Sequence, residues 1–136
     1  MFKKILIPVD LSAAEKGKIM IDAAAKVGGD STKILLLNVV EDIPAYVASE
    51  LPRGILETTR ENAETQLEDM ASASGRKMDT EVRAGSPATA ILDAAEQIEA
   101  DLIIVASHRP GLQDYLLGST AGRVVRHAKC SVLVLR

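Results

Sequence analysis

The chain has 136 residues, which suits one globular domain with a substantial core and leaves no room for a second. Aromatic residues make up only 2% of it and its formal net charge is −3, so it lacks the stacking surfaces and clustered cations of nucleic-acid-binding proteins. Its single cysteine excludes an intrachain disulfide and offers no cysteine pair for zinc, which is consistent with a cytoplasmic protein.

The first apolar segment, residues 5–9, contains Pro8 and is followed at once by Asp10. It is far too short for a signal peptide or a membrane span, so we expect a first strand and no membrane insertion. Three further short runs are nearly continuously apolar, and this pattern predicts strands that are buried on both faces. These runs are residues 34–40, 102–106 and 132–135.

The segments between these runs have the helical spacing of apolar residues. Ser12, with Glu15 three positions later, predicts the capped start of a helix over residues 12–28. Ser86 and Pro87 are typical of the N-cap and first position of another helix. The residues expected on buried helix faces are Leu56, Ala63, Leu67 and Met70 in a helix over about 52–74, Ala88, Ile91, Leu92, Ala95 and Ile98 in the helix after Ser86, and Ala121, Val124, Val125 and Ala128 in a helix starting near Gly118.

Residues 77–84 alternate between charged and less polar side chains, the pattern of a strand with one solvent-exposed face. We therefore expect this strand at an edge of the sheet. Strands that alternate with helices imply right-handed crossovers and a parallel sheet. The prediction is an α/β fold with a single domain over residues 1–136, a three-layer α/β/α sandwich around a five-stranded parallel sheet of order 3-2-1-4-5.

A pattern typical of nucleotide sites occupies residues 103–120. An apolar strand ends at Ala106, the chain becomes polar and cationic, and a helix opens at Gly118. The unpaired N–H groups and the positive dipole end of that helix favour an anion. The strand order reverses between the first and fourth strands, so their carboxyl ends, at residues 8–10 and 106–108, place a crevice at the same point.

The final strand, Ser131–Leu135, is expected at the other edge of the sheet and carries no charge until Arg136. Because an exposed apolar edge invites pairing, we predict a homodimer through this strand. Coverage by a helix of the same chain is the alternative, and the pairing of dimers into a tetramer is left open. The loop at residues 44–52, which contains Tyr46, is expected to flank the crevice.

Several segments together resemble the universal stress protein family, and the likeness spans the whole chain. They are residues 3–10 (KKILIPVD), 107–108 (SH), 117–119 (LGS) and 130–135 (CSVLVL). Residues 106–110, 115–119 and 124–128 look particularly like the F and G branch of the family. The resemblance implies a Rossmann-like fold of the adenine nucleotide alpha hydrolase type and a bound ATP, with ADP or AMP as alternatives, accompanied by Mg²⁺.

The chain departs from the family's three-glycine pattern for ATP binding at two positions. Ala106 stands at the first glycine and Arg109 at the second, while Gly118 and Ser119 match the third. The loop from Arg109 to Gly118 is also one residue shorter than in the pattern. Arg109 either fills the space that a phosphate needs or replaces the close backbone approach of glycine with a charge-assisted contact.

The resemblance implies a role for each residue at the crevice. Asp10 would contact the ribose or a phosphate-bound metal. The residues implied to line and close the adenine side are Pro8, Val9, Val39, Val105 and Ala106. The residues implied to approach the phosphates are Ser107, His108, Arg109, Gly118, Ser119 and Thr120.

Purely structural roles are the alternatives for these residues. The pair at 118–119 could serve only as a helix cap, and Asp10 as a cap or loop carboxylate. His108 could be a hydrogen-bonded structural imidazole and Arg109 a solvated surface residue. Cys130 is expected to pack rather than to react, because nothing near it in the sequence lowers its pKa.

We therefore predict a cytoplasmic, ATP-binding stress-response protein whose nucleotide occupancy changes the surface offered to an unidentified protein partner. A nucleotide-free dimeric scaffold is the alternative, and Ala106 and Arg109 favour it. Slow ATPase activity or autophosphorylation is a further alternative, since no residue is clearly a general base. A phospho-acceptor receiver is disfavoured, because residues 84–85 and Arg136 stand where that chemistry needs an aspartate and a lysine.

Overall fold

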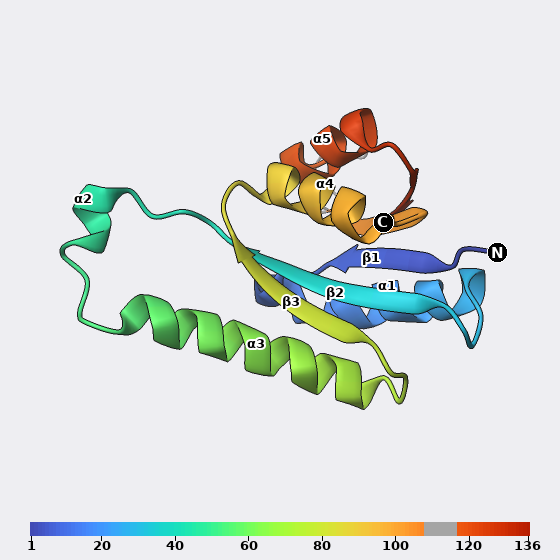
Figure 1. Ribbon diagram of the computed structural model, residues 1–136, viewed down its shortest axis with the longest axis horizontal. Helices are drawn as coiled ribbons and strands as arrows, with labels where there is room; N and C mark the ends of the chain where they lie inside the picture. The colour runs from blue at the N-terminus through green and yellow to red at the C-terminus, as the bar shows by residue number, and fades with distance from the viewer. Residues whose placement is uncertain (108–116) are drawn as a thin grey trace.

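The structure, a computed structural model, describes residues 1–107 and 117–136. Strands alternate with helices along this part of the chain (Figure 1). The strands are β1 Lys4–Pro8, β2 Lys33–Val40, β3 Asp79–Ala84, β4 Leu102–Ala106 and β5 Ser131–Leu135. The helices are the short 3-10 helix η1 Leu11–Ala13, α1 Ala14–Val27, α2 Ala45–Ala48, α3 Ile55–Ala73, α4 Pro87–Ile98 and α5 Ser119–His127.

The sheet has five parallel strands in the order β3-β2-β1-β4-β5, as the sequence predicted. β1 lies at its centre and pairs with β2 on one side and β4 on the other. In Figure 1, α1 and α3 cover one face of the sheet, and α4 and α5 cover the other. The predicted three-layer sandwich is therefore confirmed.

Side chains of the central strand point alternately into two aliphatic cores. Ile5 and Ile7 pack with Leu67 of α3 on one face of the sheet, and Leu6 packs with Ile91 of α4 on the other. Ile5, Leu6 and Ile7 have no exposed surface. Burial on both faces explains why this strand is a continuous apolar run instead of an alternating pattern.

The predicted start of the first helix was wrong. Asp10, rather than Ser12, caps the turn: its Oδ1 accepts the Ser12 backbone N–H at 2.9 Å and the Ser12 hydroxyl at 2.6 Å. An aspartate that follows a strand can cap the next turn as well as a serine can, and here it engages the serine itself. The chain consequently forms η1 first, and α1 begins at Ala14.

The region between β2 and α3 also differs from the prediction. Residues 44–52 contain the short helix α2, and they lie away from the sheet instead of flanking the crevice (Figure 1). The first turns of α3 extend past the carboxyl ends of β2 and β3, so Leu56, predicted to be inward, is 46% exposed. Val125, also predicted inward, is 43% exposed, because Ala121 and Val124 define the buried side of α5.

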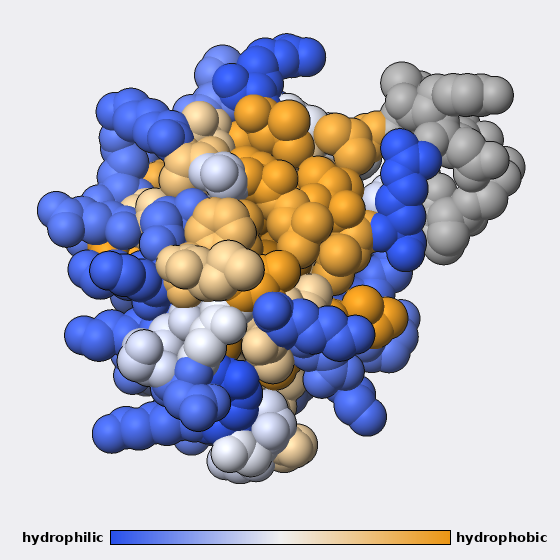
Figure 2. All heavy atoms as spheres, turned by 90° about the vertical axis from the view of Figure 1, so that its right-hand side faces the viewer, coloured by the Kyte–Doolittle hydropathy of each residue, from blue (hydrophilic) through white to orange (hydrophobic). Residues whose placement is uncertain are grey.

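The two edges of the sheet differ in chemistry. β3 carries Asp79, Glu81 and Arg83, and the Arg83 side chain pairs with Glu81 and donates to Gln97 of α4. β5 has no charged residue, and its residues 132–135 are only half-buried. Figure 2 shows apolar side chains gathered into one broad surface area on the side of the molecule that lies to the right in Figure 1.

Asp101 joins the amino ends of β1 and β4. Its carboxylate accepts the backbone N–H of Lys3 at 2.8 Å and that of Lys4 at 3.0 Å, and its own N–H donates to the Lys4 carbonyl at 2.9 Å. Burial by itself would raise the pKa of the Asp101 carboxyl. The hydrogen bonds from the backbone N–H groups of Lys3 and Lys4 have the larger combined effect, and the pKa of Asp101 lies below its ordinary value of 3.8.

Asp101→Asn should lower the free energy of unfolding by about 1 kcal/mol at neutral pH, because two N–H groups lose a charged acceptor that is partly exposed to solvent. The folded-state pKa lies below the unfolded value, so the stabilisation exists above about 3.8 and is lost as the pH falls through the folded-state pKa. Urea unfolding at pH 7 and near pH 3 should therefore show that the wild-type protein and Asp101→Asn differ less in stability at the lower pH. Asp93→Asn, on the exposed side of α4, is the matched control.

Candidate functional site

A cavity of about 390 Å³ opens at the carboxyl ends of β1 and β4, where the strand order reverses. The helices that follow β1 and β4 go to opposite faces of the sheet, α1 to one and α5 to the other, so no connection fills the space between the ends of these two strands. The cavity therefore lies where the sequence placed the crevice.

The described residues predicted for the site mostly line this cavity. They are Pro8, Val9, Asp10, Val39, Val105, Ala106, Gly118, Ser119 and Thr120. Ser107 is not among the lining residues: its N–H donates to the Leu135 carbonyl at 2.7 Å, and its own carbonyl accepts a hydrogen bond from Lys16. His108 and Arg109 lie outside the described residues.

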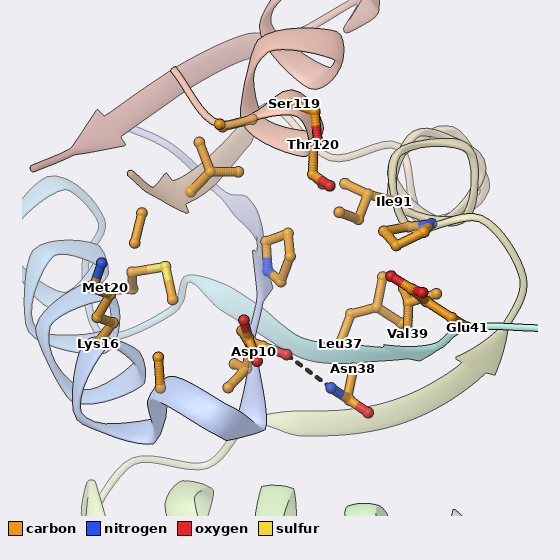
Figure 3. A pocket seen from close by; sticks show the side chains of 18 residues that line it. Asp10, Lys16, Met20, Leu37, Asn38, Val39, Glu41, Ile91, Ser119 and Thr120 are labelled. Carbon is orange, nitrogen blue, oxygen red and sulfur yellow. Dashed lines mark hydrogen bonds between the residues drawn. The ribbon is translucent and has the colours of Figure 1, made fainter. Parts of the chain in front are cut away.

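Figure 3 shows how the cavity walls are arranged. Ser119 and Thr120 lie at the start of α5 on one wall, and Asp10 lies opposite them at the end of β1. Val39 and Glu41 come from the end of β2 on a third side, and Lys16 comes from α1 on the fourth. Residues far apart in the sequence thus surround one space.

The start of α5 has no side-chain cap. Gly118 is the N-cap residue, it makes no side-chain hydrogen bond, and no acidic side chain lies in the first turn. The first N–H groups of a helix lack intrahelical partners and carry the positive end of its dipole. The end of α5 that borders the cavity is therefore suited to an anion.

Asp10 has a structural role in addition to its place in the cavity wall. Its carboxylate caps η1 through Ser12, so the alternative of a capping carboxylate is confirmed for this residue. Asn38 lies close by and is buried; its Nδ2 donates to the Val9 carbonyl at 2.9 Å, the bond drawn dashed in Figure 3. This bond fixes the end of β1 immediately before Asp10.

Three polar residues of the cavity wall, Lys16, Asn38 and Glu41, were not predicted from the sequence. Asn38 left a signal, because it is the one polar residue inside the apolar run of residues 34–40. Lys16 and Glu41 left none, since each lies among other charged or polar residues that look solvated.

Cys130 lies far from this cavity in the fold, just before the amino end of β5. Burial raises the pKa of its thiol, so the neutral form dominates at neutral pH. The thiol packs beside the core between α4, α5 and the sheet. This placement agrees with the expectation that Cys130 packs instead of reacting.

The described residues contain no group of three or more His, Cys, Asp or Glu side chains placed to hold a metal ion. In residues 1–107 and 117–136, no helix has the length and apolar character needed to cross a membrane.

Comparison with known proteins identifies the family of this chain. The family model described as the universal stress protein family matches residues 1–136. The chain belongs to the universal stress protein family. A universal stress protein of Methanocaldococcus jannaschii is 35% identical, covering 100% of this chain and 83% of the relative. Universal stress protein G of Salmonella typhimurium is 32% identical over the full length of both chains, consistent with the F and G branch.

Solved universal stress proteins have the same fold. One that was crystallised in complex with cAMP is 22% identical, covers 99% of this chain and 97% of its own, and has a TM-score of 0.65. One from Arabidopsis thaliana with AMP bound is 17% identical, covers 98% of this chain and 90% of its own, and has a TM-score of 0.62. At these identities the likeness establishes the Rossmann-like architecture.

Asn38→Ala should lower the free energy of unfolding by about 2 kcal/mol, because the buried Val9 carbonyl loses the donor that Asn38 supplies. Asn62→Ala, on the exposed surface of α3, should change stability by less than about 0.5 kcal/mol. Chemical denaturation of both variants measures the difference. Equal effects of the two substitutions would contradict a structural role for the Asn38 amide.

Proposed function

We propose that this universal stress protein binds an adenine nucleotide, ATP in the first place with ADP or AMP as alternatives, in the cavity at the ends of β1 and β4. The observation that carries this proposal is the uncapped start of α5, which faces a cavity with a largely apolar lining at the reversal of strand order. Such a space takes a base and sugar, while the helix start takes phosphate.

The cavity lining supports the two halves of this proposal. An apolar part of the lining would face the base. It consists of Pro8, Val9, Val39, Val105 and Ala106. Ser119 and Thr120 add hydroxyl groups to the N–H groups at the helix start. The AMP- and cAMP-bound relatives have the same architecture, which favours adenine among the bases.

We propose that Mg²⁺ enters with the nucleotide. The described residues offer no ligand cage of their own, and Mg²⁺ is commonly held by substrate phosphates with one or two carboxylates. Asp10 is the carboxylate at the end of the central strand that could complete its shell. The ion would neutralise phosphate charge beside the Asp10 carboxylate.

The proposed role is regulatory and cytoplasmic: nucleotide occupancy changes the surface that the protein offers to a protein partner. The end of β4 and the start of α5 both border the cavity. A nucleotide bound there would contact both elements and so would change the surface beside them.

We also propose a homodimer through β5. The strand lies at the edge of the sheet, carries no charge and leaves the apolar residues 132–135 half-buried. Pairing with the same strand of a second copy would supply its unpaired backbone groups with partners and cover these side chains.

Ser119→Glu should weaken ATP binding by at least about tenfold, because a carboxylate at the start of α5 repels phosphate. A glutamate in the first turn favours a helix, so loss of fold would not explain the result. Thr58→Glu, near the exposed start of α3, is the matched control and should leave binding unchanged. Isothermal titration calorimetry with ATP and Mg²⁺ measures both. If the wild-type protein binds no nucleotide, the proposed nucleotide function fails and the nucleotide-free scaffold is the function that remains.

Val132→Lys should convert the dimer to a monomer, because it places a charge on the β5 edge. Thr80→Lys, at a half-buried position of the β3 edge, should leave the subunit count unchanged. Sedimentation analysis distinguishes the 14.5 kDa chain from its dimer, with circular dichroism to verify folding. A monomeric wild-type protein would contradict the proposed interface.

A further inference from the structure

Two oppositely charged side chains enter the cavity from different walls, and the proposed function as stated uses neither. Lys16 comes from α1, beside the end of β4. Glu41 is the residue that directly follows β2. Figure 3 shows them on opposite sides of the cavity, with the start of α5 above and the side chains of Leu37 and Val39 near Glu41.

Lys16 is anchored at the point where β4 leaves the sheet. Its Nζ donates to the Ser107 carbonyl at 2.5 Å, and the side chain is half-buried. An ammonium group has three N–H donors, so this bond leaves two for a ligand. A compact, strongly hydrated charge of this kind is well suited to terminal phosphate oxygens.

Glu41 is the carboxylate on the opposite wall. The residue is exposed, and no hydrogen bond or ion pair joins its side chain to another described residue. In Figure 3 its carboxylate lies beside Leu37 and Val39, with Ile91 on the same side of the cavity, and these three side chains form an apolar slot next to it. A carboxylate at that place accepts hydrogen bonds and donates none.

We propose that these two side chains orient and select the nucleotide: Glu41 accepts a hydrogen bond from the exocyclic amino group of the base, and Lys16 binds the terminal phosphate. This inference rests on the proposed nucleotide function and states which nucleotides the cavity selects. The cavity takes a nucleoside polyphosphate whose base carries an amino group at position 6 of the purine, and it disfavours the 6-oxo purines.

Charge fixes the direction in which the ligand lies. Phosphates beside Glu41 would meet a like charge and no positive group of the described residues, whereas phosphates beside Lys16 and the start of α5 meet two positive features. The carboxylate on that side, Asp10, is the one proposed to share Mg²⁺ with the phosphates. With the phosphates on that side, the base occupies the apolar slot that ends at Glu41. A 6-amino group then donates to the carboxylate, while a 6-oxo group would place one acceptor against another.

The base-reading part is tested with ATP and inosine triphosphate, whose bases differ at position 6, an amino group against an oxo group, and at N1, which carries a hydrogen only in inosine triphosphate. The wild-type protein should prefer ATP. Glu41→Gln should lower the ratio of ATP to inosine triphosphate affinity roughly fivefold, because an amide can donate to the 6-oxo group, and Glu41→Ala should lower it by a similar factor. Glu50→Gln, an exposed position after α2 and outside the cavity, should leave the ratio unchanged.

The phosphate part is tested with ATP and adenosine. Lys16→Met should weaken ATP binding about tenfold and leave adenosine binding nearly unchanged, since only the charge contact with phosphate is lost. Lys16→Arg should retain most ATP affinity, and Lys18→Met, exposed on the same helix, should change neither ligand. Calorimetry gives each affinity, and thermal unfolding verifies that every variant is folded.

The outcomes separate this inference from the proposed function. If the wild-type protein binds neither ATP nor adenosine, the proposed function fails, and the selectivity falls with it. If it binds ATP but Glu41→Gln leaves the base preference intact, Glu41 does not contact the base. If Glu41→Gln instead strengthens binding of both triphosphates equally, Glu41 faces the phosphates and the proposed direction is wrong. Equal losses of ATP and adenosine affinity in Lys16→Met would overturn the phosphate contact.

Discussion

The burial of β1 on both faces and at both edges is the constraint on which the rest of the structure depends. β1 has a hydrogen-bonded strand on each side and an aliphatic core against each face, and these contacts together fix its place at the centre of the sheet. Connections from the two halves of the chain then cover opposite faces of the sheet. The cavity is the space that this divergence leaves open at the carboxyl end of β1.

Polar groups hold both ends of the central strand in place. At its amino end the Asp101 carboxylate links the backbone of residues 3–4 to β4, and at its carboxyl end the buried Asn38 amide holds the Val9 carbonyl. Asp10 then turns the chain into η1 through Ser12. Since the cavity wall begins at these carboxyl-end groups, the bonds that complete the fold also set the position of the candidate site.

Hydrophobic pattern was sufficient to predict the sheet. Strands such as β1 and β4 are buried on both faces, so their apolar runs are distinctive, and the alternating residues of β3 indicated an edge. The strand order then placed the crevice. Helix ends were less predictable, because Asp10 and Ser12 are both good capping residues and only their relative position after β1 decides between them.

The polar wall of the site was harder to predict for a related reason. Lys16 lies on a helix with two other lysines and the glutamate Glu15, and the direction of its side chain depends on where α1 begins, which η1 delays to Ala14. Glu41 faces the cavity because β2 ends at Val40, and periodicity predicts such boundaries only to within a few residues. Leu56 was misplaced because its spacing fits the buried face of α3, but the sheet ends before that turn of the helix.

The unlike edges of the sheet have a consequence for how far any assembly can grow. The β3 edge is blunted by its charges, with Arg83 tied to Glu81 and to Gln97, so it is a poor template for another strand. Strand addition is therefore open on one side alone. In the proposed dimer, a chain with one edge open to pairing would extend its sheet into one neighbour and no further, so the pair would be closed instead of growing into an open-ended fibre.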